Sequence, residues 1–234
     1  MALKQTVDVE YVESVGEPHL ACVLLLDTSG SMGKPQQNPK ISTLNKGIRE
    51  FKEIVSQDET AKSCVDVAIV EFNNEVRIIQ DFVPLNLMDT PNLGAFGQTA
   101  MGSGIATAIE LVRTRVNLYK SKGIDAYIPY ILMISDGLPT DDITIARTLV
   151  HERETKNKLR FVAAGVEGCD WGILESLTKR TIDIRKPKAF EEFFHWWSQV
   201  VISVSHSEDV KNEDIPPKPD SDSEIEVGDD FWNK

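Results

Sequence analysis

Apolar runs and amphipathic segments alternate along most of this chain. The run from Leu20 to Leu26 contains no polar residue and stops at the polar residues 27–31, which is typical of a buried parallel strand that ends in a loop. From Ile41 to Val55 apolar residues recur at helical spacing, which predicts a helix with one buried face. A second apolar run, from Ile128 to Ile134, predicts a second buried strand.

Residues between these two strands predict a hairpin. Along residues 65–69, branched apolar side chains alternate with smaller or polar ones, Asp66 among them. A further apolar segment at 76–79 follows across Asn73-Asn74, a pair suited to a two-residue turn. We therefore expect one antiparallel strand at an edge of the sheet.

The second half of the chain continues the alternation of helices and strands. The apolar spacing predicts helices near 105–118, 142–156, 171–179 and 190–205, and strands near 159–166 and 182–185. Strands that alternate with helices form doubly wound sheets. The predicted fold is α/β: a doubly wound, mostly parallel six-stranded sheet with one antiparallel edge strand and helices on both faces.

The composition changes after residue 206. Residues 207–234 carry ten acidic and three basic side chains, a net charge of −7, and show no apolar period. Such a segment has too little apolar surface to offset the entropy of ordering it. We divide the chain into an N-terminal extension at 1–17, an α/β domain at 18–206 and an acidic Pro/Ser-containing tail at 207–234.

The end of this acidic tail carries an isolated aromatic pair, Phe231-Trp232, next to Asp229 and Asp230. Aromatic side chains commonly anchor protein interfaces, so one hypothesis makes the tail an interaction arm that supports self-association. The other hypothesis is a chain end without an interaction role.

Charge and composition exclude several classes of partner. The net charge is −12 without a basic stripe, which disfavours nucleic acid, and 41% hydrophobic with 26% charged residues is typical of a globular protein rather than one that spans a membrane. Acidic residues near the N-terminus stand where a secretory signal needs an apolar core, so we expect a cytoplasmic protein. Cys22, Cys64 and Cys169 lack metal-binding spacing and are expected to be reduced thiols.

Oxygen-bearing side chains follow both predicted buried strands. Asp27 ends the first strand and is followed by Ser29 and Ser31, while Asp136 ends the second and Thr99 precedes a predicted helix. In open α/β sheets ligands gather at the carboxyl ends of strands, which brings both aspartates to one edge. Carboxylate and hydroxyl oxygens suit Mg²⁺ or Mn²⁺ better than softer metals.

Three motifs hold these residues: DTSGS at 27–31, GQT at 97–99 and ISDGLPTDD at 134–142. In this order, on these elements, they resemble a von Willebrand factor A (vWA) domain with a metal-ion-dependent adhesion site (MIDAS). The resemblance covers residues 18 to 205. A departure is Gln98, where many relatives carry Gly, and it concerns the shape of the loop more than its metal ligand.

The resemblance implies a role for each of the five residues. Ser29, Ser31 and Thr99 would be direct metal ligands, and Asp27 and Asp136 would hold metal-bound waters or coordinate in one conformational state. A divalent cation with mostly neutral ligands keeps much of its charge, so an Asp or Glu of a partner protein can take the open position. The expected function is therefore adhesion and not catalysis.

Within that superfamily, the DGLPTDD continuation and the short chain resemble the bacterial stand-alone TerY-type proteins of tellurium-resistance and stress operons. That resemblance implies a tellurite or stress-response signalling system, with a Ser/Thr protein kinase and a PP2C-type phosphatase as partners.

Two other functions stay open at this stage. One is a Mg²⁺-dependent phosphohydrolase with Asp27 as nucleophile, although haloacid-dehalogenase-type enzymes carry a second Asp two residues later, where this chain has Ser29. The other is a structural scaffold with a vestigial metal site. Asp141 and Asp142 are expected to cap the helix that follows them.

Overall fold

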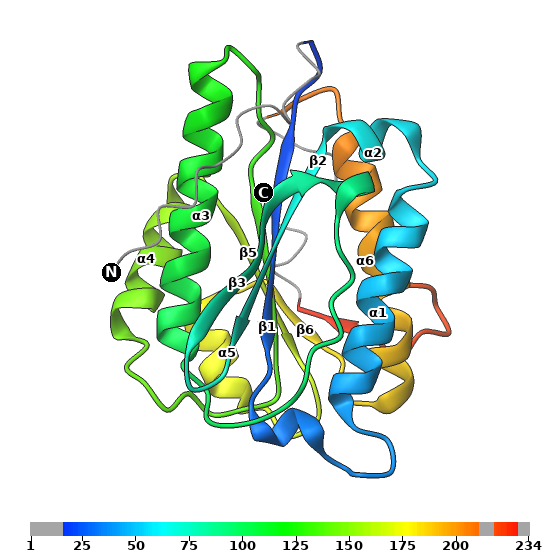
Figure 1. The fold of residues 1–234 in the computed structure, drawn as a ribbon, viewed down its shortest axis with the longest axis vertical. Helices are drawn as coiled ribbons and strands as arrows, with labels where there is room; N and C mark the ends of the chain where they lie inside the picture. Colours follow the sequence, from blue (N-terminus) through cyan, green and yellow to red (C-terminus); the bar gives the residue numbers. More distant parts are fainter. Residues whose placement is uncertain (1–15, 211–217, 229–234) are drawn as a thin grey trace.

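A mixed seven-stranded sheet forms the centre of the molecule in the computed structural model, which describes residues 16–210 and 218–228 (Figure 1). The inner strands run parallel, and an antiparallel strand lies at each edge. In spatial order the strands are β3 (Val76–Pro84), β2 (Val65–Phe72), β1 (Leu20–Asp27), β4 (Tyr130–Ser135), β5 (Arg160–Gly165), β6 (Thr181–Asp183) and β7 (Glu226–Val227). The predicted α/β class, with a mostly parallel sheet, is confirmed.

Helices cover both faces of this sheet (Figure 1). One face carries α1 (Lys40–Val55), α2 (Glu59–Cys64) and α6 (Pro187–Ser205), and the other carries α3 (Met101–Ser121), α4 (Thr144–Thr155) and α5 (Trp171–Leu177). The central strand β1 is buried along its whole length: Cys22 and Leu24 pack toward α1 and α6, whereas Val23 and Leu25 pack toward α3. A strand buried on both faces needs an unbroken apolar run, which is the pattern of residues 20–26.

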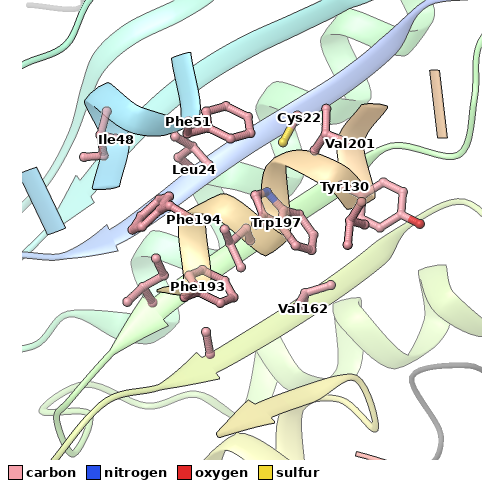
Figure 2. Packing of buried hydrophobic residues seen from close by; sticks show 14 of the residues in the cluster. Cys22, Leu24, Ile48, Phe51, Tyr130, Val162, Phe193, Phe194, Trp197 and Val201 are labelled. Atoms are coloured by element: carbon pink, nitrogen blue, oxygen red, sulfur yellow. The ribbon is translucent and has the colours of Figure 1, made fainter. Parts of the chain in front are cut away.

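The apolar helix α6 packs against the middle of the sheet. Phe193, Phe194 and Trp197 are fully buried, and Figure 2 shows Phe194 on the side toward α1 and Trp197 near Tyr130 of β4. Phe194 fits against α1 where that helix carries Gly47, because a Cβ there would lie 1.9 Å from a ring carbon of Phe194. The predicted helix near 190–205 is confirmed, and its apolar side chains form part of the core.

The sheet has one strand more than the six predicted. The added strand β7 comes from the acidic segment, with Val227 opposite Ile182 of β6, and Ile225 just before it is 7% exposed and joins the core beside α6. A two-residue strand is too short to show a hydrophobic period, so the sequence pattern misses it, as it misses the six-residue α2. The Phe231-Trp232 pair lies outside the described residues.

Buried polar side chains meet at the amino ends of β1 and β2. The predicted metal ligands lie at the other end of the sheet, where the parallel strands have their carboxyl ends. Asp66 is fully buried and is within hydrogen-bonding distance of His19 Nδ1 (3.1 Å), the Tyr119 hydroxyl and the Arg115 guanidinium (2.9 Å). The alternating pattern of residues 65–69 gives no sign that this carboxylate is in the core.

Within residues 16–210 and 218–228, no helix is both long enough and apolar enough to cross a membrane.

Candidate metal centre

The two aspartates predicted to lie at one edge of the sheet do come at the ends of neighbouring strands. β1 and β4 are adjacent and parallel, with Leu26 opposite Ile134, so Asp27 and Asp136 come to the same edge of the sheet. Both are buried, with exposed fractions of 0% and 2%. Two buried carboxylates at the same edge are stable in the folded protein only when positive charge or hydrogen-bond donors compensate their negative charge.

The loop after β1 supplies several of those donors. The Ser29 N–H donates to Asp27 Oδ1 (2.8 Å), which turns the chain sharply at the strand end. The Ser29 and Ser31 hydroxyl oxygens are 3.0 Å apart, and the Ser31 hydroxyl donates to Asp136 Oδ1 (2.6 Å). Ser135 completes the set, since its hydroxyl donates to Asp27 Oδ2 (2.6 Å). The structure thus joins Asp27, Ser29, Ser31 and Asp136 in one network.

Thr99 lies on the loop before α3, at the same end of the sheet as this network. That loop is tied to the first one, because the Phe96 N–H donates to the Thr28 carbonyl (2.9 Å) and the Gly30 N–H donates to the Gly97 carbonyl (3.1 Å). Thr99 itself is 5% exposed. A loop fixed by backbone hydrogen bonds holds the threonine hydroxyl in one place.

Gly137 marks the space that these side chains share. A Cβ at this position would lie 3.1 Å from Thr99 Oγ1 and 3.4 Å from Asp27 Oδ2. Thr99 and Asp27 therefore face the same small volume beside Asp136, and a larger residue at 137 would intrude on it. All five side chains predicted from the sequence come together at this edge.

Burial changes the titration of the central carboxylate. It raises the pKa of Asp27 above its ordinary value, and the negative charge of Asp136 acts in the same direction. Hydrogen bonds from Ser135 and Ser29 act in the opposite direction but do not cancel the effect of burial. A cation at this site would favour the ionised form of Asp27, because opposite charges stabilise each other.

The structure also places a positive charge that the sequence analysis missed. Lys40, the first residue of α1, forms an ion pair with Asp136 Oδ2 through its ammonium group, which also donates to the Glu167 carbonyl (2.7 Å). Its side chain is 14% exposed. No motif marks Lys40, because it lies 96 positions from the aspartate that it contacts.

The prediction that both Asp141 and Asp142 cap the following helix is wrong for Asp141. Asp141 caps α3 instead, because its carboxylate accepts hydrogen bonds from the N–H groups of Gly102 and Ser103, each at 2.9 Å. Asp142 accepts from the Thr144 N–H (2.8 Å) at the start of α4. The loop after β4 thus stabilises the helix that follows Thr99, which fixes the relative position of the two loops.

The donor set fits a hard divalent cation. Two carboxylates and three hydroxyls converge, all of them oxygen donors, and a small cation such as Mg²⁺ or Mn²⁺ prefers such ligands together with water. In the described part of the chain, no three His, Cys, Asp or Glu side chains form a separate metal-binding group. The site at the ends of β1 and β4 is therefore the strongest metal candidate among these residues.

Exposed apolar side chains surround this edge of the sheet. Phe96 is 49% exposed in the loop before Thr99, Leu138 is 59% exposed two residues after Asp136, and Ile145 is 71% exposed at the start of α4. A protein bound at this edge would be able to bury these side chains.

Comparisons with known proteins show the fold. No protein-family model matches the sequence, and no curated protein matches it. Among solved structures, the pilus adhesin SpaC from Lactobacillus rhamnosus GG is similar over 80% of this chain and 31% of its own, with TM-score 0.63 and 11% identity. The PilB minor pilin from Streptococcus sanguinis is similar over 79% of this chain and 61% of its own, with TM-score 0.56 and 16% identity.

A third structure is proximal thread matrix protein 1 from the mussel byssus with a zinc-occupied MIDAS motif, with TM-score 0.52 and 15% identity over 78% of this chain and 48% of its own. This chain spans less than two thirds of each of these proteins. At such low identity the likeness shows the fold alone. That fold agrees with the vWA-like fold that the motifs imply.

Proposed function

We propose that this protein is a metal-dependent protein-interaction module, in which Mg²⁺ or Mn²⁺ held at the ends of β1 and β4 binds an acidic side chain of a partner protein. The observation that carries the proposal is the convergence of two buried carboxylates and three hydroxyls on one small volume beside Gly137. The zinc-occupied MIDAS motif of a structural neighbour supports the binding of a divalent metal in general.

Each residue has a defined task in this proposal. Ser29, Ser31 and Thr99 would be the direct ligands, and Asp27 and Asp136 would hold metal-bound waters or coordinate directly. When bound, the metal supplies a positive centre that accepts a carboxylate oxygen. Ser135 orients Asp27 through its 2.6 Å hydrogen bond, and the backbone bonds between the two loops keep Thr99 in place.

The rim of the site indicates what kind of partner segment fits. Because Phe96, Leu138 and Ile145 are exposed around it, a partner that presents Asp or Glu next to apolar side chains would bury both. The TerY-type resemblance favours a cytoplasmic stress-response setting and, as candidate partners, a Ser/Thr kinase and a PP2C-type phosphatase. Tellurite resistance and self-association through the acidic tail belong to the same set of proposals.

The contacts of Asp27 disfavour the alternative function, a phosphohydrolase. Both of its carboxylate oxygens already accept hydrogen bonds, from the Ser29 N–H and the Ser135 hydroxyl, and its side chain is fully buried. Full burial keeps a phosphate ester away from this carboxylate, and Ser29 stands where haloacid-dehalogenase-type enzymes carry their general acid. Hydrolysis of p-nitrophenyl phosphate in Mg²⁺ above that of Asp27→Ala would reverse this conclusion.

Peptide display tests the proposed function directly. A random peptide library is selected on the full chain in Mg²⁺ and released with EDTA. Asp27→Ala and Thr99→Ala serve as matched proteins that each lack one metal-site side chain. We expect the released peptides to share an Asp or Glu beside apolar residues, and the two variants to retain few of them. Peptides that bind equally well in EDTA, or equally well to the variants, would contradict the proposal.

A further inference from the structure

The Lys40 ammonium forms an ion pair with Asp136, one of the two carboxylates of the predicted metal site. A cation of the protein itself thus lies beside the position proposed for the metal. Asp136 uses both of its oxygens: Oδ1 accepts from the Ser31 hydroxyl, and Oδ2 pairs with Lys40. The same ammonium donates to the Glu167 carbonyl, so it is held from two sides and has little contact with water. The ammonium therefore places a positive charge directly beside Asp136.

Lys40 changes the net charge of the metal-loaded site. Asp27 and Asp136 together carry two negative charges, and a divalent cation alone would neutralise them, which would leave the loaded site without net charge. With Lys40 in place the loaded site has one net positive charge. A single carboxylate from a partner then completes neutrality, whereas a neutral group does not.

We propose that Lys40 is a built-in counter-cation of the metal site: it weakens metal binding and gives the loaded site the positive charge that selects a carboxylate ligand. This inference rests on the proposed function. It assigns to Lys40 a role in specificity, while the metal ligands remain the five oxygen-bearing residues. Without metal, the same lysine stabilises Asp136 in the buried network.

A purely positioning role makes the opposite prediction. If Lys40 only held Asp136 in the right orientation, its removal would leave that carboxylate less well placed, and metal affinity would fall. As a counter-cation it repels the metal, so its removal must increase metal affinity. The direction of one affinity change therefore separates the two roles.

The first measurement is the binding of Mn²⁺, followed through the electron paramagnetic resonance signal of the free ion. The proteins are the full chain, Lys40→Met, Lys40→Arg and, as a control for net charge, Lys34→Met at an exposed position nearby in sequence. We expect Lys40→Met to bind Mn²⁺ about tenfold more tightly. Lys40→Arg and Lys34→Met should stay within about twofold of the unmodified chain.

The second measurement uses acetate as the carboxylate probe and acetamide as its neutral counterpart, each followed by the broadening of its methyl proton resonance by protein-bound Mn²⁺. We expect Lys40→Met to bind acetate more weakly than the unmodified chain even though it holds Mn²⁺ more tightly, and acetamide to be unaffected. Thermal unfolding in EDTA should show a lower melting temperature for Lys40→Met and recovery in Lys40→Arg.

The outcomes separate this inference from the proposed function. If the unmodified chain binds no Mn²⁺ at this site, the proposed function fails and the inference fails with it. If the chain binds Mn²⁺ but Lys40→Met binds it equally or less tightly, only the inference is overturned and Lys40 is a positioning residue. Tighter Mn²⁺ binding with unchanged or stronger acetate binding would overturn the selection of carboxylates.

Discussion

Replacing Asp66 with Asn will destabilise the protein strongly, because it removes the negative charge from a buried cluster and leaves a buried guanidinium. Asp66 is fully buried, and Arg115, which is 4% exposed, pairs with it at 2.9 Å. His19 and the Tyr119 hydroxyl also contact the same carboxylate oxygen. After the substitution the Arg115 charge would remain in the core without its counter-charge.

The expected size of the effect follows from that geometry. Breaking a buried ion pair by removing one partner typically costs about 3–5 kcal/mol. For a domain of this size, 1 kcal/mol corresponds to roughly 2–4 °C in melting temperature, so Asp66→Asn should lower it by about 10 °C at neutral pH. Removing both charges in Asp66→Leu/Arg115→Met should cost much less than the sum of the single changes, because no unpaired charge remains.

The effect depends on pH with a definite sign. Burial alone would raise the pKa of Asp66, but the hydrogen bond from His19, the charge of Arg115 and the hydrogen bond from Tyr119 together lower it below its ordinary value of 3.8. A carboxyl group with a lowered pKa in the folded state contributes its full stabilisation above that ordinary value. The contribution is lost as the pH falls below 3.8 toward the folded-state pKa, so the difference between the chain and Asp66→Asn should shrink there.

Urea unfolding of the two proteins, the double variant and Arg115→Met measures these differences. Arg113→Met is the matched control, since Arg113 lies on the same helix but is 54% exposed and pairs only at the surface with Glu110. Its urea midpoint should match that of the unmodified chain, because exposed ion pairs contribute little to stability. A loss below about 1 kcal/mol for Asp66→Asn, or single effects that add up in the double variant, would show that Asp66 and Arg115 do not form a coupled buried ion pair.

Two further predictions concern packing, and thermal unfolding checks both. Gly47→Ala should lower stability by about 1–3 kcal/mol, because its Cβ would overlap the Phe194 ring at 1.9 Å. Lys46→Ala, on the exposed side of the same helix, should not lower it. An unchanged melting temperature for Gly47→Ala would contradict this packing. A chain that ends at Val210 should fold, but its free energy of unfolding should fall by about 2 kcal/mol, because it lacks the buried Ile225 and strand β7. Failure to fold would place the domain boundary beyond residue 210.

The sequence predicts the positions of those site residues that come at the end of an apolar run or at the start of a helix. The order of the strands in the sheet then brings these residues together. Asp27 and Asp136 each come at the end of an apolar run typical of a buried strand, and parallel neighbours bring their carboxyl ends together. Thr99 is found because it precedes a helix whose start lies at the same edge. These three inferences need no knowledge of side-chain contacts.

The parts that the sequence misses depend on partners from distant segments. Asp66 occupies a polar position in an alternating strand, and its burial follows only from Arg115 and Tyr119 on α3. Lys40 begins a helix as many lysines do, and its contact with Asp136 depends on how α1 meets the end of β4. Single-sequence periodicity describes which face of an element is buried but not which polar groups meet across the fold.

Anomalous diffraction from a crystal of the full chain grown in Mn²⁺ tests directly whether the five converging residues hold a divalent metal. We expect one strong anomalous peak beside Gly137, within coordination distance of the Ser29, Ser31 and Thr99 hydroxyl oxygens, and its loss in Asp27→Ala. A peak away from these three hydroxyls, or no peak at saturating Mn²⁺, would contradict the proposed metal site.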